Sequence, residues 1–324
     1  MTINTSEKRI NQYTIAFYNL ENLFDTKDDP KKLDNDFTEK AERNWNLRRF
    51  NKKVRNLGQV IQQIGFKDIS HPPVLIGVAE IENAFVLRKL VDSEFLKNKK
   101  YDFVHFNSPD ERGIDTALIY RKEFFKIIEK KAITVFLQDE YGKRDFTRDI
   151  LYIKGLLENE SVHVLINHWP SRRTGAEETS YKRVTAAKKN REVVASIIKE
   201  DPSAKIIIMG DFNDDPSSES VRKLVGFDLY NPMELLHTKY SGSTNYRGNW
   251  NLFDQIILSN NFLQQHGNSF RFNEAKIFNA KSLTEFKGRS KGNPFRTFLG
   301  RKYNGGISDH FPVYGTFSIL QGEQ

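Results

Sequence analysis

Two kinds of apolar pattern recur along the chain. Short continuous apolar runs, such as PVLIGVA (73–79) and AKIIIMG (204–210), are bounded by polar or turn residues. Runs of this length predict strands in a sheet that is covered on both faces. The segment 44–65 differs, because its apolar residues recur at alternating intervals of three and four. This spacing predicts an amphipathic helix that ends at Gly65.

The same patterns assign most of the chain to elements. Helices are expected over 44–65, 83–96 and 179–200. Strands are expected over 12–20, 72–80, 101–106, 115–121, 150–158, 161–169, 204–214, 251–259 and 309–320, with 150–158 and 161–169 paired as a hairpin. Helices and strands are mixed throughout and no internal repeat is present. A layered α/β architecture with packed sheets is the natural solution.

Composition narrows the possible partners. The chain has 324 residues, a net charge of +8 and a pI of about 9.3, which favours anionic partners: nucleic acid, phosphorylated metabolites or lipid headgroups. No run approaches the roughly 18–20 apolar residues of a membrane span, so we expect no stable membrane insertion. The polar N-terminus lacks a signal-peptide core and indicates a cytoplasmic protein, although a chain trimmed of its signal would look the same. Cysteine is absent, which excludes disulfides, thiolate zinc sites and cysteine nucleophiles.

Two segments resemble loops. Residues 25–37 are rich in acids but lack the glycine and glutamate positions of an EF-hand, which favours a solvated loop over a calcium site. Residues 280–306 are rich in glycine and basic residues, with four aromatic residues interleaved: Phe286, Phe295, Phe298 and Tyr303. A loop this long in a compact domain is usually functional or disordered. The roles of 25–45 and 280–306 stay open.

Polar residues with catalytic chemistry follow or open several apolar runs. They are Asn19, Glu21, Glu80, His168, Asp211, Asn213, Asp254, Asp309 and His310. One such strand end carries little weight, but the repetition predicts a single cleft lined by carboxylates, an asparagine and two histidines. This is the makeup of a hard-cation site with general acid/base groups attached.

Each residue taken alone also has a simpler interpretation. Asn19 and Asn213 could cap turns, and Asp211 could cap a helix. Asp254 could protect a strand edge, and His310 could be a core histidine. Glu80 is hardest to explain this way, because a charge directly after VLIGVA needs a partner.

The residues of the stretch 165–173, LINHWPSRR, likewise have both a structural and a functional interpretation. His168 could end a strand as a satisfied histidine or face a phosphate. Trp169 could pack under a loop or form a wall of the site. Asn167, Arg172 and Arg173 are candidates for contacts to the substrate.

In this order the motifs resemble a known superfamily. YNLENLFD, GVAEIEN, RGIDTALIYR, NHWPSR, GDFND and SDHFPVYG occur as in the endonuclease/exonuclease/phosphatase superfamily, over about residues 13–317. The resemblance implies a four-layer α/β sandwich, with two facing mixed β-sheets flanked by helices. It also implies one catalytic domain over 13–320 after a tail of residues 1–12, which we expect to be monomeric.

The resemblance assigns roles position by position. Glu80 is similar to the family's metal-binding glutamate, with Glu21, Asp309 and Asn19 near the metal. His310 resembles the general base, and Asp254 the acid that orients it. Asp211, Asn213 and His168 resemble the groups that hold the attacking water and the phosphate, and Arg112 resembles a phosphate-contacting arginine. The implied cofactor is Mg²⁺, with Mn²⁺ and Ca²⁺ as alternatives.

The sequence favours a metal-dependent nuclease that hydrolyses phosphodiesters by in-line attack of an activated water. Its charge and the basic, aromatic loop 280–306 suit a nucleic acid, DNA ahead of RNA. A basic run in the helix 179–200 could add contacts or be a solvated face. The alternative is a phosphatase or phosphodiesterase acting on a small metabolite or lipid headgroup. The inositol-phosphatase branch has a PAWCDR-like segment where this chain has NLFDQI, which argues against that branch. A third hypothesis is a catalytically silent binding module on this fold. The acids and histidines present at every expected position argue against it.

Overall fold

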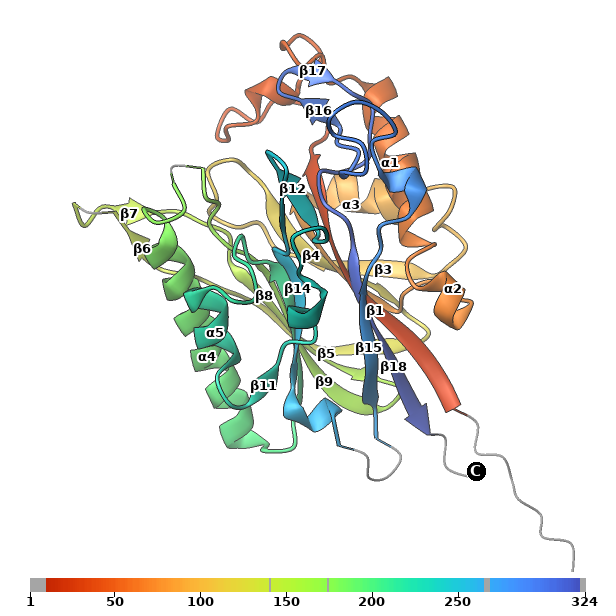
Figure 1. Cartoon of the computed structure of the whole chain (residues 1–324), viewed down its shortest axis with the longest axis vertical. Helices are drawn as coiled ribbons and strands as arrows, with labels where there is room; N and C mark the ends of the chain where they lie inside the picture. Colours follow the sequence, from red (N-terminus) through yellow and green to blue (C-terminus); the bar gives the residue numbers. More distant parts are fainter. Residues whose placement is uncertain (1–9, 140, 174, 265–268, 321–324) are drawn as a thin grey trace, which may run out of the picture.

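Two six-stranded mixed sheets pack face to face, and helices cover their outer faces (Figure 1). The structure is a computed structural model that describes residues 10–139, 141–173, 175–264 and 269–320. The first sheet has the strand order β15-β18-β1-β2-β4-β3 and the second has β11-β14-β10-β9-β8-β5. The four-layer α/β sandwich is therefore confirmed.

The elements have the following bounds. In the first sheet they are β1 (Ile10–Leu23), β2 (Leu75–Ile81), β3 (Tyr101–His105), β4 (Asp115–Arg121), β15 (Arg271–Ile277) and β18 (Val313–Leu320). In the second they are β5 (Phe125–Ile133), β8 (Ile150–Leu157), β9 (Glu160–His168), β10 (Lys205–Asp211), β11 (Leu229–Tyr230) and β14 (Asp254–Ser259). Short ribbons are β6 (Leu137–Gln138) with β7 (Arg144–Asp145), β12 (Thr244–Tyr246) with β13 (Asn249–Asn251), and β16 (Phe298–Leu299) with β17 (Lys302–Tyr303). The helices are α1 (Leu47–Ile61), α2 (Phe66–Ile69), α3 (Ala84–Val91), α4 (Ser180–Glu200) and α5 (Glu219–Val225).

The central strands send alternate side chains to two cores. On β1, Ile15 and Phe17 enter the core between the sheets, whereas Ala16 and Tyr18 enter the core under α1 and α3. The second sheet repeats this arrangement, with one core between the sheets and one under α4 and α5. Because both faces are buried, these strands read as continuous apolar runs in the sequence.

The three expected helices are present as α1, α3 and α4, with two differences in detail, whereas α2 and α5 were not expected. On α1 the side chains of Phe50, Val54 and Ile61 are buried, but Leu47, in the first turn, is exposed. The helix expected over 83–96 ends at Val91, and turns follow it.

Besides several strands of two or three residues, the sequence patterns missed the longer strands β5 and β15. Each forms one edge of its sheet, and most of its side chains are at least partly exposed. Lysine and glutamate break any apolar run in KIIEKKAI and RFNEAKI. Charged edges of this kind discourage pairing with other chains.

The two expected loops pack against each other. Phe37 and Trp45 from the first contact Phe298 from the second, with ring centroids 6.2 and 5.9 Å apart. The second loop also contains β16 and β17. Of the tail expected over 1–12, residues 10–12 belong to β1, and the remainder lies outside the described residues.

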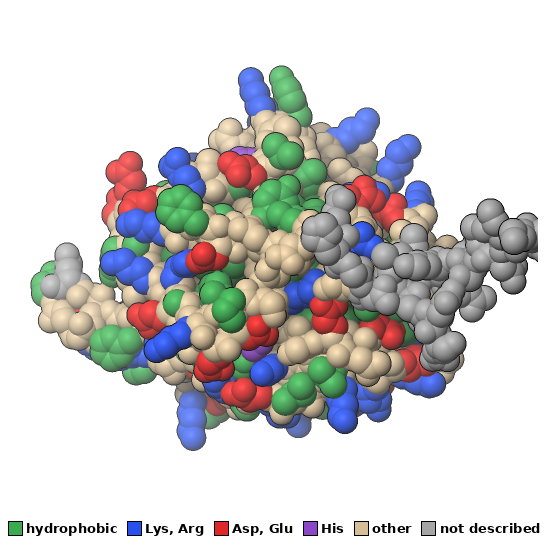
Figure 2. All heavy atoms as spheres, turned by 90° about the horizontal axis from the view of Figure 1, so that it is seen from below, with side chains coloured by type: hydrophobic (Ala, Val, Ile, Leu, Met, Phe, Trp, Pro, Cys, Tyr) green, Lys and Arg blue, Asp and Glu red, His purple; other side chains and the backbone are tan. Residues whose placement is uncertain are grey.

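The surface carries both signs of charge. The end of the molecule where β1 begins shows basic and acidic side chains interspersed (Figure 2). Within the described residues, none of the helices has the length and apolar character needed to cross a membrane.

Candidate active site

Three strands of the second sheet place polar side chains in one row. The register pairs Asp211 of β10 with His168 of β9 on one side and with Asp254 of β14 on the other. β9 and β10 are parallel and end here, whereas the antiparallel β14 begins here. Alternate side chains of each strand face the first sheet, as Ile166, Met209 and Ile256 do. His168, Asp211 and Asp254 are each two residues away from one of these and therefore lie on the same face. Strand period and register therefore bring the three buried groups together between the sheets.

Asp254 and His310 form a buried pair. Nδ1 of His310 lies 2.6 Å from Oδ2 of Asp254, whose side chain is fully buried. Burial alone would lower the pKa of His310, but the carboxylates of Asp254, Asp211 and Asp309 raise it well above its usual value. These carboxylates favour the protonated imidazole, whose Nε2 faces Asp211 at 3.9 Å.

Asp211 lies between the two sheets. Its Oδ2 accepts a hydrogen bond from Nδ2 of Asn19 at 2.9 Å, and its Oδ1 accepts one from the backbone N–H of Asn213 at 2.9 Å. Burial raises the pKa of Asp211 to about 6, against the lowering effect of His310. Asn19 continues the alternation of Ile15 and Phe17, so β1 sends it across to the second sheet.

His168 is buried and neutral. Burial lowers its pKa well below the usual value, and the positive charges of Arg148, Arg112 and His310 lower it further. Its Nε2 lies 3.8 Å from Asp211 and 3.9 Å from Oε1 of Glu80. Its Nδ1 has no hydrogen-bond partner among the described residues.

Arg148 supports this part of the site and was missed by the sequence analysis. Its guanidinium donates to the carbonyl oxygens of His168 and Trp169 at 3.1 and 2.6 Å, and to Asp110 at 2.9 Å. The buried arginine thereby fixes the end of β9. It precedes β8 and follows no apolar run, so no pattern in the sequence indicated it.

Glu80 lies at a break in the pairing of β1 and β2. The register shifts between Asn19 and Leu23, and Oε2 of Glu80 accepts the backbone N–H of Asn22 at 2.9 Å. Glu80 has a φ of 61°, a left-handed conformation that costs a residue of this type roughly 1–3 kcal/mol. Arg112 donates to Oδ1 of Asn22 at 2.7 Å, which anchors it beside Glu80.

Glu21 and Asp309 already have protein partners. The carboxylate of Glu21 accepts the backbone N–H of Thr297 at 2.6 Å. Burial and Asp309 raise the pKa of Glu21 to about 7. Asp309 accepts a hydrogen bond from Arg296, and the charges of His310 and Arg296 outweigh burial to lower its pKa. Metal binding by Glu21 and Asp309 stays a prediction, because both carboxylates hold the loop 280–306.

The stretch 165–173 divides between the site and its support. Asn167 points to the opposite face from His168, where it bonds to Asn190 of α4 and accepts Nε1–H of Trp169 at 3.0 Å. Trp169 is buried against Phe212, with ring centroids 4.7 Å apart. Asn167 therefore does not join the groups around Asp211.

The two arginines that follow differ from each other. Arg172 donates to the carbonyl oxygen of Asn213 at 2.7 Å and pairs with Asp214 at 2.6 Å. Asn213 in turn donates from Nδ2 to the carbonyl oxygen of Trp169 at 3.0 Å. Arg172 is thus committed to the protein, whereas Arg173 is exposed and lines a small cavity beside Arg148.

The donor atoms suit a hard cation. Asp211, Asp254 and His310 lie close enough to hold an ion, and Oδ1 of the buried Asp254 has no hydrogen-bond partner among the described residues. The imidazole of His310 is already bonded to Asp254 through Nδ1, however. The carboxylate of Glu80, whose Oε1 lies 3.9 Å from His168, offers the oxygen donors that Mg²⁺ prefers and is the better candidate ligand.

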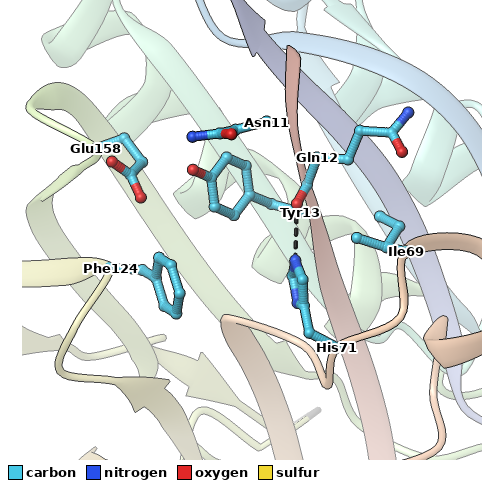
Figure 3. A pocket seen from close by; sticks show the side chains of 7 residues that line it. All are labelled: Asn11, Gln12, Tyr13, Ile69, His71, Phe124 and Glu158. Carbon is cyan, nitrogen blue, oxygen red and sulfur yellow. Dashed lines mark hydrogen bonds between the residues drawn. The ribbon is translucent and has the colours of Figure 1, made fainter. Parts of the chain in front are cut away.

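A second cavity lies at the other end of β1, far from Asn19. Tyr13, His71, Phe124 and Glu158 line it, and His71 bonds through Nε2 to the carbonyl oxygen of Gln12 at 2.8 Å (Figure 3). None of the site residues expected from the sequence lines this cavity.

Solved structures share the fold at low sequence identity. An endonuclease/exonuclease/phosphatase family protein from Bacteroides thetaiotaomicron is 18% identical with a TM-score of 0.58, over 97% of this chain and 100% of that one. A mannosyl-6-phosphatase from the same organism is 17% identical with a TM-score of 0.57, over 94% and 99% of the two chains. D. rerio TDP2 complexed with a single strand DNA product is 17% identical with a TM-score of 0.56, over 94% and 98%.

Sequence comparison assigns the family. No curated protein matches the chain significantly. The model of the Endonuclease/Exonuclease/phosphatase family matches residues 14–318, nearly the whole chain. The chain therefore belongs to the endonuclease/exonuclease/phosphatase family of phosphoester hydrolases.

Proposed function

We propose that the protein is a divalent-metal-dependent nuclease that hydrolyses phosphodiester bonds of nucleic acid by in-line attack of water. The observation that carries this proposal is the row His168–Asp211–Asp254, completed by His310 at 2.6 Å from Asp254. The surroundings raise the pKa of His310 well above its usual value and lower the pKa of His168 well below it. Groups whose pKa values are driven apart are typical of acid/base sites.

The side chains divide the work. Asp211 accepts a proton from the attacking water, since its raised pKa of about 6 makes it a better base than an ordinary aspartate. Asn19 and the N–H of Asn213 hold that carboxylate in place. The protonated His310, oriented by Asp254, donates a hydrogen bond to the phosphoryl oxygens as negative charge gathers there.

Glu80 is the principal candidate to hold Mg²⁺, with Asn19 and Asp309 nearby. When bound, the ion neutralises charge on the phosphoryl oxygens and the leaving group. Mg²⁺ needs only one or two carboxylates, because waters and phosphate oxygens complete its shell. Arg112 and the neutral His168 complete the phosphate-binding side.

The choice of nucleic acid is supported by charge and by analogy. The chain carries a net charge of +8, and Arg173 is exposed beside the site. D. rerio TDP2, which has the same fold, is seen with a single strand DNA product. The basic run on α4 adds little, because all of its members except Lys188 pair within the protein: Lys182 with Asp145, Arg183 with Asp214, Lys189 with Glu192 and Arg191 with Asp228.

The second candidate is hydrolysis of a small phosphorylated metabolite. The mannosyl-6-phosphatase of similar fold motivates it. Two of the four aromatic residues of loop 280–306 also weaken the expectation of stacking bases there. Phe298 is buried, and Tyr303 packs against Phe298 and under Arg49.

Parallel assays with several classes of substrate test the proposal. Purified protein is given Mg²⁺ with single-stranded DNA, RNA, a generic phosphodiester and sugar phosphates in parallel. We expect cleavage of the polymer, lost by at least about 100-fold in Glu80→Gln, which preserves the shape of the side chain. Turnover of sugar phosphates without any cleavage of polymer would reject the nuclease and favour the second candidate.

A further inference from the structure

A large open cavity adjoins the catalytic centre. It has a volume of about 730 Å³, within the range of small-molecule sites. Its lining comes from the β12–β13 hairpin and from loop 280–306, and it includes Asp309. Loop 280–306, with β16 and β17, lies at the top of the molecule in Figure 1, and β12 lies below it.

The β12–β13 hairpin is bonded directly to the segment before β18 that carries Asp309 and His310. Thr244 bridges to His310, and its Oγ1 donates to the carbonyl oxygen of Asp309 at 2.9 Å. Trp250 of β13 stacks on the buried Phe311 with ring centroids 5.9 Å apart. A ligand in the cavity therefore contacts the segment that carries His310.

The cavity combines an exposed aromatic ring with arginines. Tyr246 lines it and is 64% exposed, so its ring is accessible to a ligand in the cavity. Arg247 and Arg289 also line it and are exposed, and neither forms an ion pair within the described part of the chain. Arg247 lies over one face of the Tyr246 ring, 5.1 Å from its centroid, which leaves the other face for a base. The third arginine, Arg296, is paired with Asp309 and forms the wall toward the centre.

The lining also includes Glu285, whose carboxylate accepts a hydrogen bond from Asn304 at 2.6 Å, and two amide side chains. Nδ2 of Asn293 donates to Oδ1 of Asn245 at 3.3 Å, which joins the loop to the hairpin. This bond leaves the amide nitrogen of Asn245 and the amide oxygen of Asn293 open to a ligand, as far as the described residues show. One donor and one acceptor beside an aromatic ring match the edge and face of a nucleobase.

We propose that this cavity binds the nucleotide next to the scissile phosphate of a single strand. The base lies against Tyr246, and Arg247 and Arg289 contact the neighbouring phosphate. Tyr246 and Arg289 are then specificity-determining residues, which select a strand over a small phosphoester. This inference rests on the proposed nuclease function, but its central claim concerns binding and is tested without turnover.

Binding is measured by fluorescence anisotropy with a labelled single-stranded oligonucleotide in EDTA, where metal-dependent cleavage is absent. We expect Tyr246→Ala to weaken binding by about 5- to 150-fold, the usual effect of losing one stacked base. Arg289→Ala should reduce the slope of log K against log salt by about 0.7, the value for one phosphate of a single strand. The matched controls Tyr240→Ala and Arg222→Ala, exposed residues outside the cavity, should stay within about twofold.

The possible results distinguish a failure of the cavity proposal from a failure of the nuclease proposal. Binding that depends on Tyr246, in a protein that cleaves no polymer with Mg²⁺, supports the cavity and rejects the nuclease. Cleavage by a Tyr246→Ala protein that binds like the wild type overturns the cavity and keeps the nuclease. Displacement of the oligonucleotide by a sugar phosphate at equal concentration would also overturn it, since the cavity would then suit a small anion. Equal melting temperatures of all variants exclude unfolding as the cause.

Discussion

At the scale of single residues, the pair Asp254–His310 sets the protonation state of the site. Asp254 is fully buried, and its Oδ2 lies 2.6 Å from Nδ1 of His310. Its charge is the largest of those that raise the pKa of His310 against the effect of burial. A group this strongly perturbed should leave its mark on the dependence of activity on pH.

Asp254→Asn tests this role. We expect turnover to fall by about 10²- to 10⁴-fold, because the imidazole loses both its orientation and its charge. The pKa of His310 should fall, so the alkaline limb of the pH–rate profile should move to lower pH. The measurement is kcat/KM between pH 5 and 10. A variant with reduced activity but an unmoved alkaline limb would contradict the role given to His310.

The lowered pKa of His168 should make the folded protein less stable at acid pH. Its folded pKa is depressed by burial, so below pH ~6.5 the unfolded chain binds a proton that the folded protein does not. The free energy of unfolding therefore falls as pH decreases. The loss should approach about 1.4 kcal/mol per pH unit from this group.

His168→Asn removes this contribution and isolates it. Urea denaturation of both proteins at pH 7, 6 and 5 measures the difference between their free energies of unfolding. We expect that difference to shift in favour of the variant as pH falls. A constant difference would mean that His168 keeps an ordinary pKa in the folded protein.

At the scale of elements, the close approach of β9 and β10 positions Asp211. A Cβ on Gly210 would lie 2.4 Å from the carbonyl oxygen of Asn167, a backbone atom that cannot move alone. Gly210→Ala should therefore separate the strands beside His168 and Asp211. We expect a destabilisation of about 1–3 kcal/mol and a loss of turnover.

Thermal unfolding and kcat of Gly210→Ala check this prediction. Gly300→Ala is a suitable control, because a Cβ there would meet nothing within 4 Å and only the positive φ of 60° would be strained. If Gly210→Ala is no less stable or active than the control, the spacing of these strands is not a constraint on the site.

A buried lysine joins three elements behind the site. Lys53 of α1 donates to the carbonyl oxygen of Glu21, at the end of β1, and to Oγ1 of Thr297 in loop 280–306 at 2.6 Å. Lys53→Met should leave these acceptors unpaired and destabilise the protein by roughly 1–3 kcal/mol. The exposed Lys97→Met should change stability by less than about 0.5 kcal/mol. Equal melting temperatures for the two variants would show that the lysine does not join these elements.

At the scale of the whole molecule, the sequence predicted the central strands better than their surroundings. Continuous apolar runs identified β1, β2, β9 and β10, because strands buried on both faces have few alternatives. The edge strands β5 and β15 lack that signal. The alternation of side chains along β9 could have separated His168 from Asn167, since only His168 shares the face of Ile166. Contacts between distant segments, such as Arg148 with His168 or Glu21 with Thr297, depend on the tertiary fold and leave no pattern in the sequence.

Binding of a divalent metal ion should increase the stability of the whole fold. Glu80 and Asp211 both lie within 4 Å of Nε2 of His168, Asp309 lies beside His310, and burial raises the pKa of Asp211. A divalent ion that binds only the folded state should stabilise it by about 2.7 kcal/mol at 100 times its Kd. Melting temperature should therefore rise with Mg²⁺ and fall again with EDTA, while Glu80→Gln should show little response. Titration with NaCl at matched ionic strength controls for screening, since only a site-bound ion discriminates between the two proteins. A rise of equal size in both would place the ion elsewhere and remove Glu80 from its proposed role.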